Sequence, residues 1–154
     1  MYAVLLVLHS YLRWAVLGLA VAGLVRAFSG FRAGRGWVAA DERLAKLTLA
    51  SIDTQLLLGL ALYFVSPVVS TARQNMAAAM HDRTLRFFSV EHLSMMLLAV
   101  AVAHIGRVRA KKHGEAPTRH KTTLLTLVGF LVLVAASIPW PFLPHGRPLL
   151  RGLL

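Results

Sequence analysis

The chain has 154 residues, no cysteine and few acids. The lack of cysteine excludes disulfide bonds and thiolate metal sites. Only 6 residues are Asp or Glu against 17 Lys or Arg, and charged residues make up 15% of the chain, whereas soluble domains usually carry about 25%. The sequence also contains no phosphate-binding loop, nucleophile elbow or zinc signature. What it does contain is long uncharged stretches separated by basic segments.

Four of these stretches are long enough to cross a membrane. A hydrocarbon core of about 30 Å needs roughly 20 helical residues, and helices satisfy their own backbone groups in lipid. We expect helices at residues 3–27, 45–66, 86–108 and 121–142, within one transmembrane domain of residues 1–154. The predicted fold class is all-α, an integral membrane four-helix up-down bundle. The first stretch lacks a basic leader and a small-residue cleavage site, so we expect a retained helix rather than a signal peptide.

Three segments outside these stretches carry local signals. Residues 29–37 are rich in Gly and Arg, which predicts an irregular loop. Thr71 and Gln74 have the spacing of a capping box, which predicts a short interfacial helix over residues 72–81. The tail from Pro139 onward contains three further prolines, Pro141, Pro144 and Pro148, and should therefore be irregular. Trp140 is expected to act as an interface anchor.

The basic residues predict an orientation in the membrane. Two loops carry eleven cations: Arg26, Arg32, Arg35, Arg43, Lys46, Arg107, Arg109, Lys111, Lys112, Arg119 and Lys121. The opposite side carries five: Arg73, Arg83, Arg86, Arg147 and Arg151. The positive-inside rule places the two basic loops in the cytoplasm and both termini outside. The net charge of +11 therefore reflects membrane orientation and contact with a lipid bilayer, not nucleic-acid binding.

The two halves of the chain share a pattern that suggests a tandem repeat of two helical hairpins. When His9 is aligned with His92, both halves read His-x10-Ala-x2-Gly-x-Val-Arg-Ala. The alternative is a chance match among common residues. If the repeat is real, an axis along the membrane normal relates the hairpins.

His9 and His92 are the main candidates for chemistry. Each lies seventeen residues before an arginine at the cytoplasmic interface, Arg26 or Arg109, so the two histidines should have equal depth. The first and third helices of an up-down bundle are diagonal neighbours. Two facing imidazoles are suited to axial ligation of haem iron. A haem b explains the pair better than a bare metal ion; the alternative is that each ring only bonds a carbonyl.

Two charged residues near these histidines are candidate cofactor contacts. Arg13 lies one turn from His9 and would neutralise a haem propionate or pair with Glu91. Glu91 is expected either to pair with Arg13 at the cofactor site or to pair with Arg86 at the outer interface.

Other polar residues in the spans offer weaker sites. His104 and His120 are secondary metal candidates, but His104 is rotated about 120° from the face of His92, so a second haem is not expected. His120 and His113 are assigned to the basic loops. Asp53 is expected to be protonated, to pair with His104 or to serve a proton or quinone site. Gln55 is expected to bridge helices.

Several motifs together resemble a known family. They are LHSYLRW (8–14), DTQLLLGL (53–60), LRFFSVEH (85–92), GRVRAKK (106–112), RHK (119–121) and IPWPF (138–142). They are similar to small bacterial four-helix membrane proteins labelled cytochrome b, and more distantly to the half-bundles of haem A synthase. The resemblance implies b-type haem in a bacterial inner membrane, with His9 and His92 as ligands, and it extends less directly to His120. Relatives often carry histidine at the position of Asp53, which argues against a ligand on the second helix here.

These observations lead to one main hypothesis and two alternatives. The main one is a membrane haem b protein that passes electrons, to or from quinone or a respiratory partner, rather than an enzyme with its own substrate. The first alternative is a non-redox accessory subunit of a larger complex; the second is a small proton-linked transporter that uses Asp53, Arg13 and Glu91. The sequence leaves open whether the chain forms a homo-oligomer.

Overall fold

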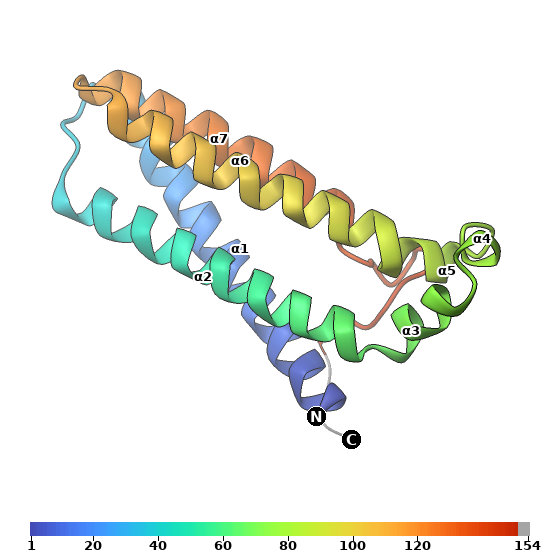
Figure 1. Cartoon of the computed structure of the whole chain (residues 1–154). Helices are drawn as coiled ribbons and strands as arrows, with labels where there is room; N and C mark the ends of the chain where they lie inside the picture. Colours follow the sequence, from blue (N-terminus) through green and yellow to red (C-terminus); the bar gives the residue numbers. More distant parts are fainter. Residues whose placement is uncertain (151–154) are drawn as a thin grey trace.

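The computed structural model describes residues 1–150, and these residues form helices and connecting segments without a strand. Four helical spans are long and apolar enough to cross a membrane: α1 (Tyr2–Arg32), α2 (Ala39–Val65), the continuous span Arg83–Lys112, and α7 (Ala116–Ser137). The predicted all-α membrane bundle is confirmed (Figure 1). Arg151, one of the five cations counted above, lies outside the described residues.

The spans are arranged in an antiparallel bundle. Helix α1 packs along α2 and α7, and α6 (His92–Lys112) packs along α7, whereas α2 and α6 touch over a shorter stretch. The first and third spans are therefore diagonal. One end of the bundle holds the connections 33–38 and 113–115; we call it the basic end. The other, called the cavity end, holds the N-terminus, the short helices between α2 and α6, and residues 138–150 (Figure 1).

The first two helices are longer at the basic end than predicted. Helix α1 continues from the expected residue 27 to Arg32, so much of the segment predicted to be irregular is helical. It stops where Gly34 adopts φ +60, a conformation that favours glycine. Helix α2 begins at Ala39 instead of 45, because the Asp41 carboxylate accepts a hydrogen bond from the Val38 amide and caps the first turn. The apolar run measures the part in hydrocarbon, whereas the helix continues into the headgroup region.

The third span contains a local change of helix type. Helix α5 (Arg83–Arg86) leads into a π-helical turn, η1 (Phe87–Glu91), which continues directly into α6. The Tyr63 hydroxyl donates to the Ser89 carbonyl of this turn at 3.2 Å. The predicted range of 86–108 was thus too short at both ends, and it missed the π-turn immediately before His92.

The fourth span and the short helices also differ from their predicted ranges. Helix α7 covers Ala116–Ser137, not 121–142, and ends just before Pro139 as the proline pattern requires. Between α2 and α5 the chain forms α3 (Pro67–Gln74), capped by Ser66, and α4 (Met76–Ala79), capped by Asn75. The capping box at Thr71 was therefore wrong. The tail after α7 is irregular as expected.

The residues shared by the two halves occupy similar environments. Ala20 and Ala103 are buried, as are Ala27 and Ala110 one to two turns further along. Gly23 faces Leu127 of α7, and Gly106 lies against Thr126 of the same helix. These small residues let α1 and α6 approach α7 closely. The tandem origin of the hairpins stays a prediction.

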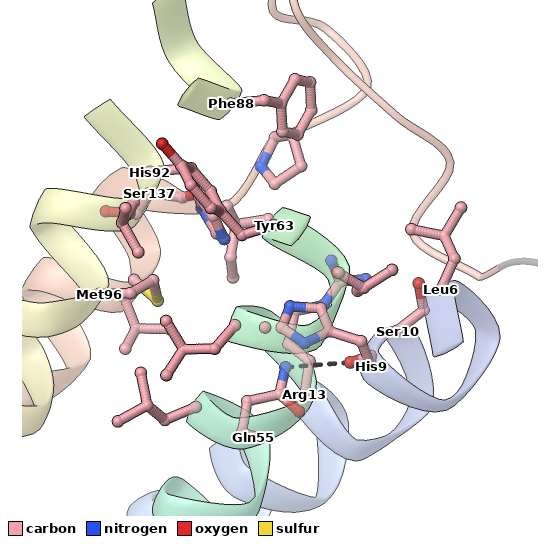
Figure 2. Close-up of a pocket in the computed structure, with 18 of the residues that line it drawn as sticks. Leu6, His9, Ser10, Arg13, Gln55, Tyr63, Phe88, His92, Met96 and Ser137 are labelled. Carbon is pink, nitrogen blue, oxygen red and sulfur yellow. Dashed lines mark hydrogen bonds between the residues drawn. The ribbon is translucent and has the colours of Figure 1, made fainter. Parts of the chain in front are cut away.

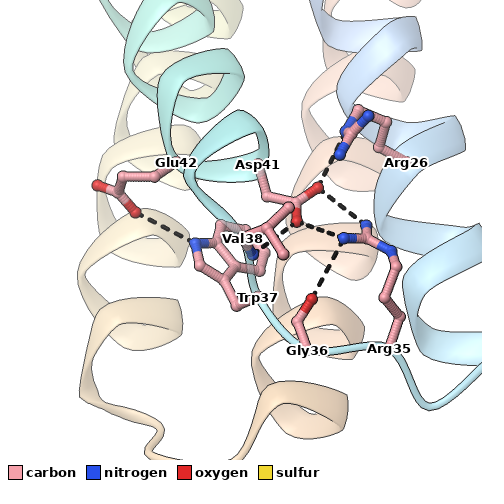
Figure 3. Close-up of polar contacts among 7 residues, drawn as sticks. All are labelled: Arg26, Arg35, Gly36, Trp37, Val38, Asp41 and Glu42. Carbon is pink, nitrogen blue, oxygen red and sulfur yellow. Dashed lines mark hydrogen bonds and ion pairs between the residues drawn. The ribbon is translucent and has the colours of Figure 1, made fainter.

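Two acids organise the basic end. Asp41, whose side chain is 2% exposed, accepts from Arg26 at 2.9 Å and from Arg35 at 2.8 Å (Figure 3). The bond to Asp41 raises the pKa of the Arg35 guanidinium above its already high value. Glu42 pairs with Arg107, with Arg119 at 2.6 Å and with the Trp37 indole N–H at 3.2 Å. The two carboxylates thus connect α1, α2, α6 and α7.

His120 is a buried residue, not part of an exposed loop as predicted. It lies in the second turn of α7 with 0% exposure. Its ring sits directly against Gly30 of α1, where a Cβ would collide with it, and 5.0 Å from the Trp37 ring. The Arg119 guanidinium stacks on the Trp37 ring, 4.2 Å from its centroid. The absence of a side chain at Gly30 is what allows α1 to seal this end.

Candidate functional site

A cavity of about 380 Å³ lies among the membrane helices toward the cavity end. Small-molecule and cofactor sites usually occupy roughly 300–1,000 Å³. All four spans contribute to its wall, which is mainly apolar with a few polar side chains (Figure 2). The polar and charged contributors are Tyr2, His9, Ser10, Arg13, Gln55, Tyr63, Ser66, His92, Ser137 and Arg147. Its lining is that of a site for a largely apolar ligand with a few fixed polar contacts.

The structure brings His9 and His92 together across this cavity. Their ring centroids are 6.5 Å apart and the ring planes are inclined at 73° (Figure 2). The expectation of equal depth on diagonal helices is confirmed. A metal ion held between two imidazole nitrogens, each about 2 Å away, separates the centroids by roughly 6 Å. The observed separation is therefore the size that one shared metal ion requires.

The orientation of His92 leaves one definite nitrogen for a ligand. Its Nδ1 lies 2.8 Å from the Ser137 carbonyl oxygen. A carbonyl only accepts, so Nδ1 carries the proton and Nε2 carries the lone pair. Metal-binding histidines are commonly held in this way, with the second nitrogen donating to a carbonyl. The carbonyl is available because it belongs to the last turn of α7.

Helix α2 positions His9 through a glycine and an amide. A Cβ at Gly59 would lie 3.2 Å from His9 Cε1, so the ring occupies the space that this glycine leaves. Gln55 Nε2, one turn away, donates to the His9 carbonyl at 3.0 Å, which confirms the predicted helix bridge (Figure 2). Nδ1 of His9 is buried without a hydrogen-bond partner in the described part of the chain. A buried polar nitrogen without a hydrogen bond destabilises the folded protein, and a bound ligand that supplies a partner would remove this cost.

The irregular tail packs against the cavity at the cavity end of the bundle. The Arg13 guanidinium donates to the Leu149 carbonyl at 2.6 Å, and the Trp14 indole N–H lies 3.3 Å from the same oxygen. Arg147 of the tail also lines the cavity, and its guanidinium stacks 5.4 Å from the Phe88 ring. Two cationic side chains, Arg13 and Arg147, therefore stand at the cavity wall.

Glu91 does not join this site. Its carboxylate pairs with Arg86 at 2.6 Å, and both side chains are substantially exposed. Glu91 is not among the described residues that line the cavity. Of the two predicted roles, pairing with Arg86 is confirmed, and the structure does not bring Glu91 to the cavity because it points about 100° away from His92 on the helix.

His104 and His120, the secondary metal candidates, belong to separate places. His104 Nε2 bonds Asp53 Oδ1 at 2.7 Å, the pairing foreseen for Asp53. His120 is enclosed by Gly30 and Trp37 at the basic end. Within residues 1–150 no group of three or more His, Cys, Asp or Glu side chains forms a metal site.

The residues present fit a haem in their donor chemistry. A haem supplies four nitrogen ligands itself, so two opposed imidazoles complete its coordination. The apolar wall suits the macrocycle, and Arg13 and Arg147 suit its carboxylates.

Sequence reasoning did not single out Gly59, Tyr63, Arg147 and the tail around Leu149 as parts of the site. Gly59 and Tyr63 follow Gln55 at helical spacing and could have been found from that pattern. The tail has no periodicity that would reveal its return to α1. No family model, curated protein or solved structure matches the chain.

Proposed function

We propose that the protein is a bacterial inner-membrane carrier of one b-type haem and that it takes part in electron transfer. The observation that carries the proposal is the 6.5 Å separation of the His9 and His92 rings across an apolar cavity within a membrane bundle. The motif resemblance points in the same direction. The excess of cations at the basic end favours an orientation with that end in the cytoplasm and the cavity end outside.

Each residue of the site has a defined part in this proposal. His92 and His9 hold the iron through imidazole nitrogens, with the His92 ring fixed by the Ser137 carbonyl. Arg13 and Arg147 provide positive charge for the haem carboxylates at the outer end. The haem supplies one-electron chemistry, and the apolar wall excludes water from it.

The test is the absorption spectrum of the purified protein. We expect a sharp α band and a shifted Soret band after reduction with dithionite, one haem per chain, and a low-spin signal in electron paramagnetic resonance. His9→Ala and His92→Ala should each abolish the low-spin signal. His113→Ala is the matched control, since His113 lies in the exposed connection at the basic end, and it should retain the full spectrum.

The alternatives give different results. A preparation that lacks these bands, although haem was supplied during expression, overturns the proposal. Stoichiometric co-purification with a larger complex would then select the accessory subunit. Transport that fails in Asp53→Asn would select the proton-linked carrier.

A further inference from the structure

Asp53 and His104 form an ionisable pair that is partly exposed on the membrane-spanning part of the bundle. The two side chains meet at 2.7 Å between α2 and α6, yet they are 47% and 45% exposed. Asp53 lies near the middle of α2, and His104 lies about 12 Å from the end of α6. Their exposed surface therefore faces lipid, where an ionisable group is expensive and marks a functional site by default.

The pair also lies at the most open seam of the bundle. Helices α2 and α6 touch over a shorter stretch than the other neighbouring spans. Ala50 and Ala101, both exposed, lie one turn before Asp53 and His104, and the exposed Leu57 and Val108 lie one turn after them. A flat molecule within the bilayer can approach the pair over the two alanines and rest against the two apolar side chains.

The hydrogen-bonding capacity of the pair is only partly used. The Nε2–Oδ1 bond joins the two side chains, and within residues 1–150 neither makes another hydrogen bond. One imidazole nitrogen and one carboxylate oxygen are left facing lipid. When the carboxyl group of Asp53 donates its proton to Nε2, Nδ1 of His104 carries a hydrogen and donates while the second carboxyl oxygen accepts, which complements the carbonyl and hydroxyl oxygens of a quinone or quinol headgroup.

The pair is close to the cavity wall. Val100, which lines the cavity, lies one turn before His104, and Ile52 and Gln55, which also line it, flank Asp53 in sequence. One helical turn is about 5.4 Å. A headgroup at the pair would therefore lie about one turn from the nearest cavity-lining residue, although His104 itself is twelve residues, about 18 Å, along α6 from His92.

We propose that Asp53 and His104 form a binding site for the headgroup of a lipid-soluble quinone that enters from the bilayer between α2 and α6. The choice of a quinone rests on the proposed function, because a quinone is a redox partner that can reach a membrane electron carrier through lipid. The geometry of the pair, its exposure and its free hydrogen-bonding groups are independent of the haem.

The test is photolabelling of the full chain in lipid nanodiscs with a short-chain azidobenzoquinone. We expect label on α2 and α6 within one turn of the pair, and suppression by an excess of unlabelled quinone. The double variant Asp53→Leu/His104→Leu should reduce this labelling at least tenfold. Replacing both partners leaves no unpaired charge, and circular dichroism checks that the helices remain. Thr54→Ala is the matched control: Thr54 is exposed beside Asp53 and bonds only its own helix at Ala50.

Each outcome decides the matter. Unchanged labelling in the double variant, or label on other helices, overturns the quinone site. Loss of a dimer in the double variant, without specific wild-type labelling, overturns it in favour of contact with a second chain. Specific labelling without a haem spectrum supports the quinone site and overturns the proposed function. A haem spectrum without specific labelling supports the proposed function and overturns the quinone site.

Discussion

The same four helices are packed closely at the basic end of the bundle and enclose a cavity at the other end. At the basic end, Asp41 and Glu42 connect every span, and His120 fills the space above Gly30. At the cavity end the same helices enclose about 380 Å³, and a second glycine, Gly59, makes room for a ring that faces this space. The difference indicates that the closed end fixes the relative positions of the helices, so that the open end can keep a cavity without collapsing.

The largest effect is expected from Gly30→Ala at the basic end. The new Cβ would overlap the His120 ring, which is fully buried and has no free space to move into. Overpacking of this kind costs about 3 kcal/mol. The measurement is unfolding in nanodiscs followed by circular dichroism. Gly18→Ala is the control, because a Cβ there meets no atom within 4 Å, and it should leave stability equal or slightly higher.

A smaller loss is expected from Asp41→Asn. The substitution removes a buried carboxylate from two arginines that are themselves 42% and 33% exposed. Breaking a fully buried pair costs 3–5 kcal/mol, but solvent reaches these arginines, so we expect about 2 kcal/mol. Glu115→Gln should have almost no effect, because the Glu115 side chain makes no capping bond to α7. Equal losses in the two variants would show that Asp41 does not organise this end.

The smallest effect on stability is expected from Gly59→Ala, the same substitution at the open end. Its Cβ would lie 3.2 Å from His9 Cε1, and the ring can shift by a few tenths of an ångström toward the cavity. We expect less than about 1 kcal/mol in unfolding. Under the haem proposal, the change should instead appear in the ligand site, as a displaced Soret band and weaker haem retention. A stability loss as large as that of Gly30→Ala would contradict the contrast between the two ends.

The sequence predicted the spans and the histidine pair because both depend on simple distances. Hydrophobic length sets the number of crossings, and the equal spacing of His9 and His92 from Arg26 and Arg109 sets their common depth. It did not predict where the helices end, because helices continue through polar headgroups where hydropathy no longer marks them. The burial of His120 depends on the absence of a side chain at Gly30, ninety positions earlier in the chain, and no local pattern carries that information.

The contact between the C-terminal tail and α1 could not be predicted either, because no local sequence pattern marks it. The contact joins Arg13 to Leu149, and it rests on a backbone carbonyl, which every residue possesses. Glu91 precedes His92 directly, so it points about 100° away from that imidazole and pairs with Arg86 instead.

The π-turn before His92 has a consequence for how the chain tolerates changes in length. A π-turn holds one more residue than the α-helical path over the same distance, so η1 stores a surplus residue between α5 and α6. Deleting Val90 would let the turn tighten into an ordinary α-helix, with the preceding and following helices kept in phase. A deletion further along, inside α6, would instead rotate everything on one side of it by about 100° relative to the other. The stretch before His92 is thus the one part of the third span where the chain can be shortened by a residue while the imidazole keeps its direction.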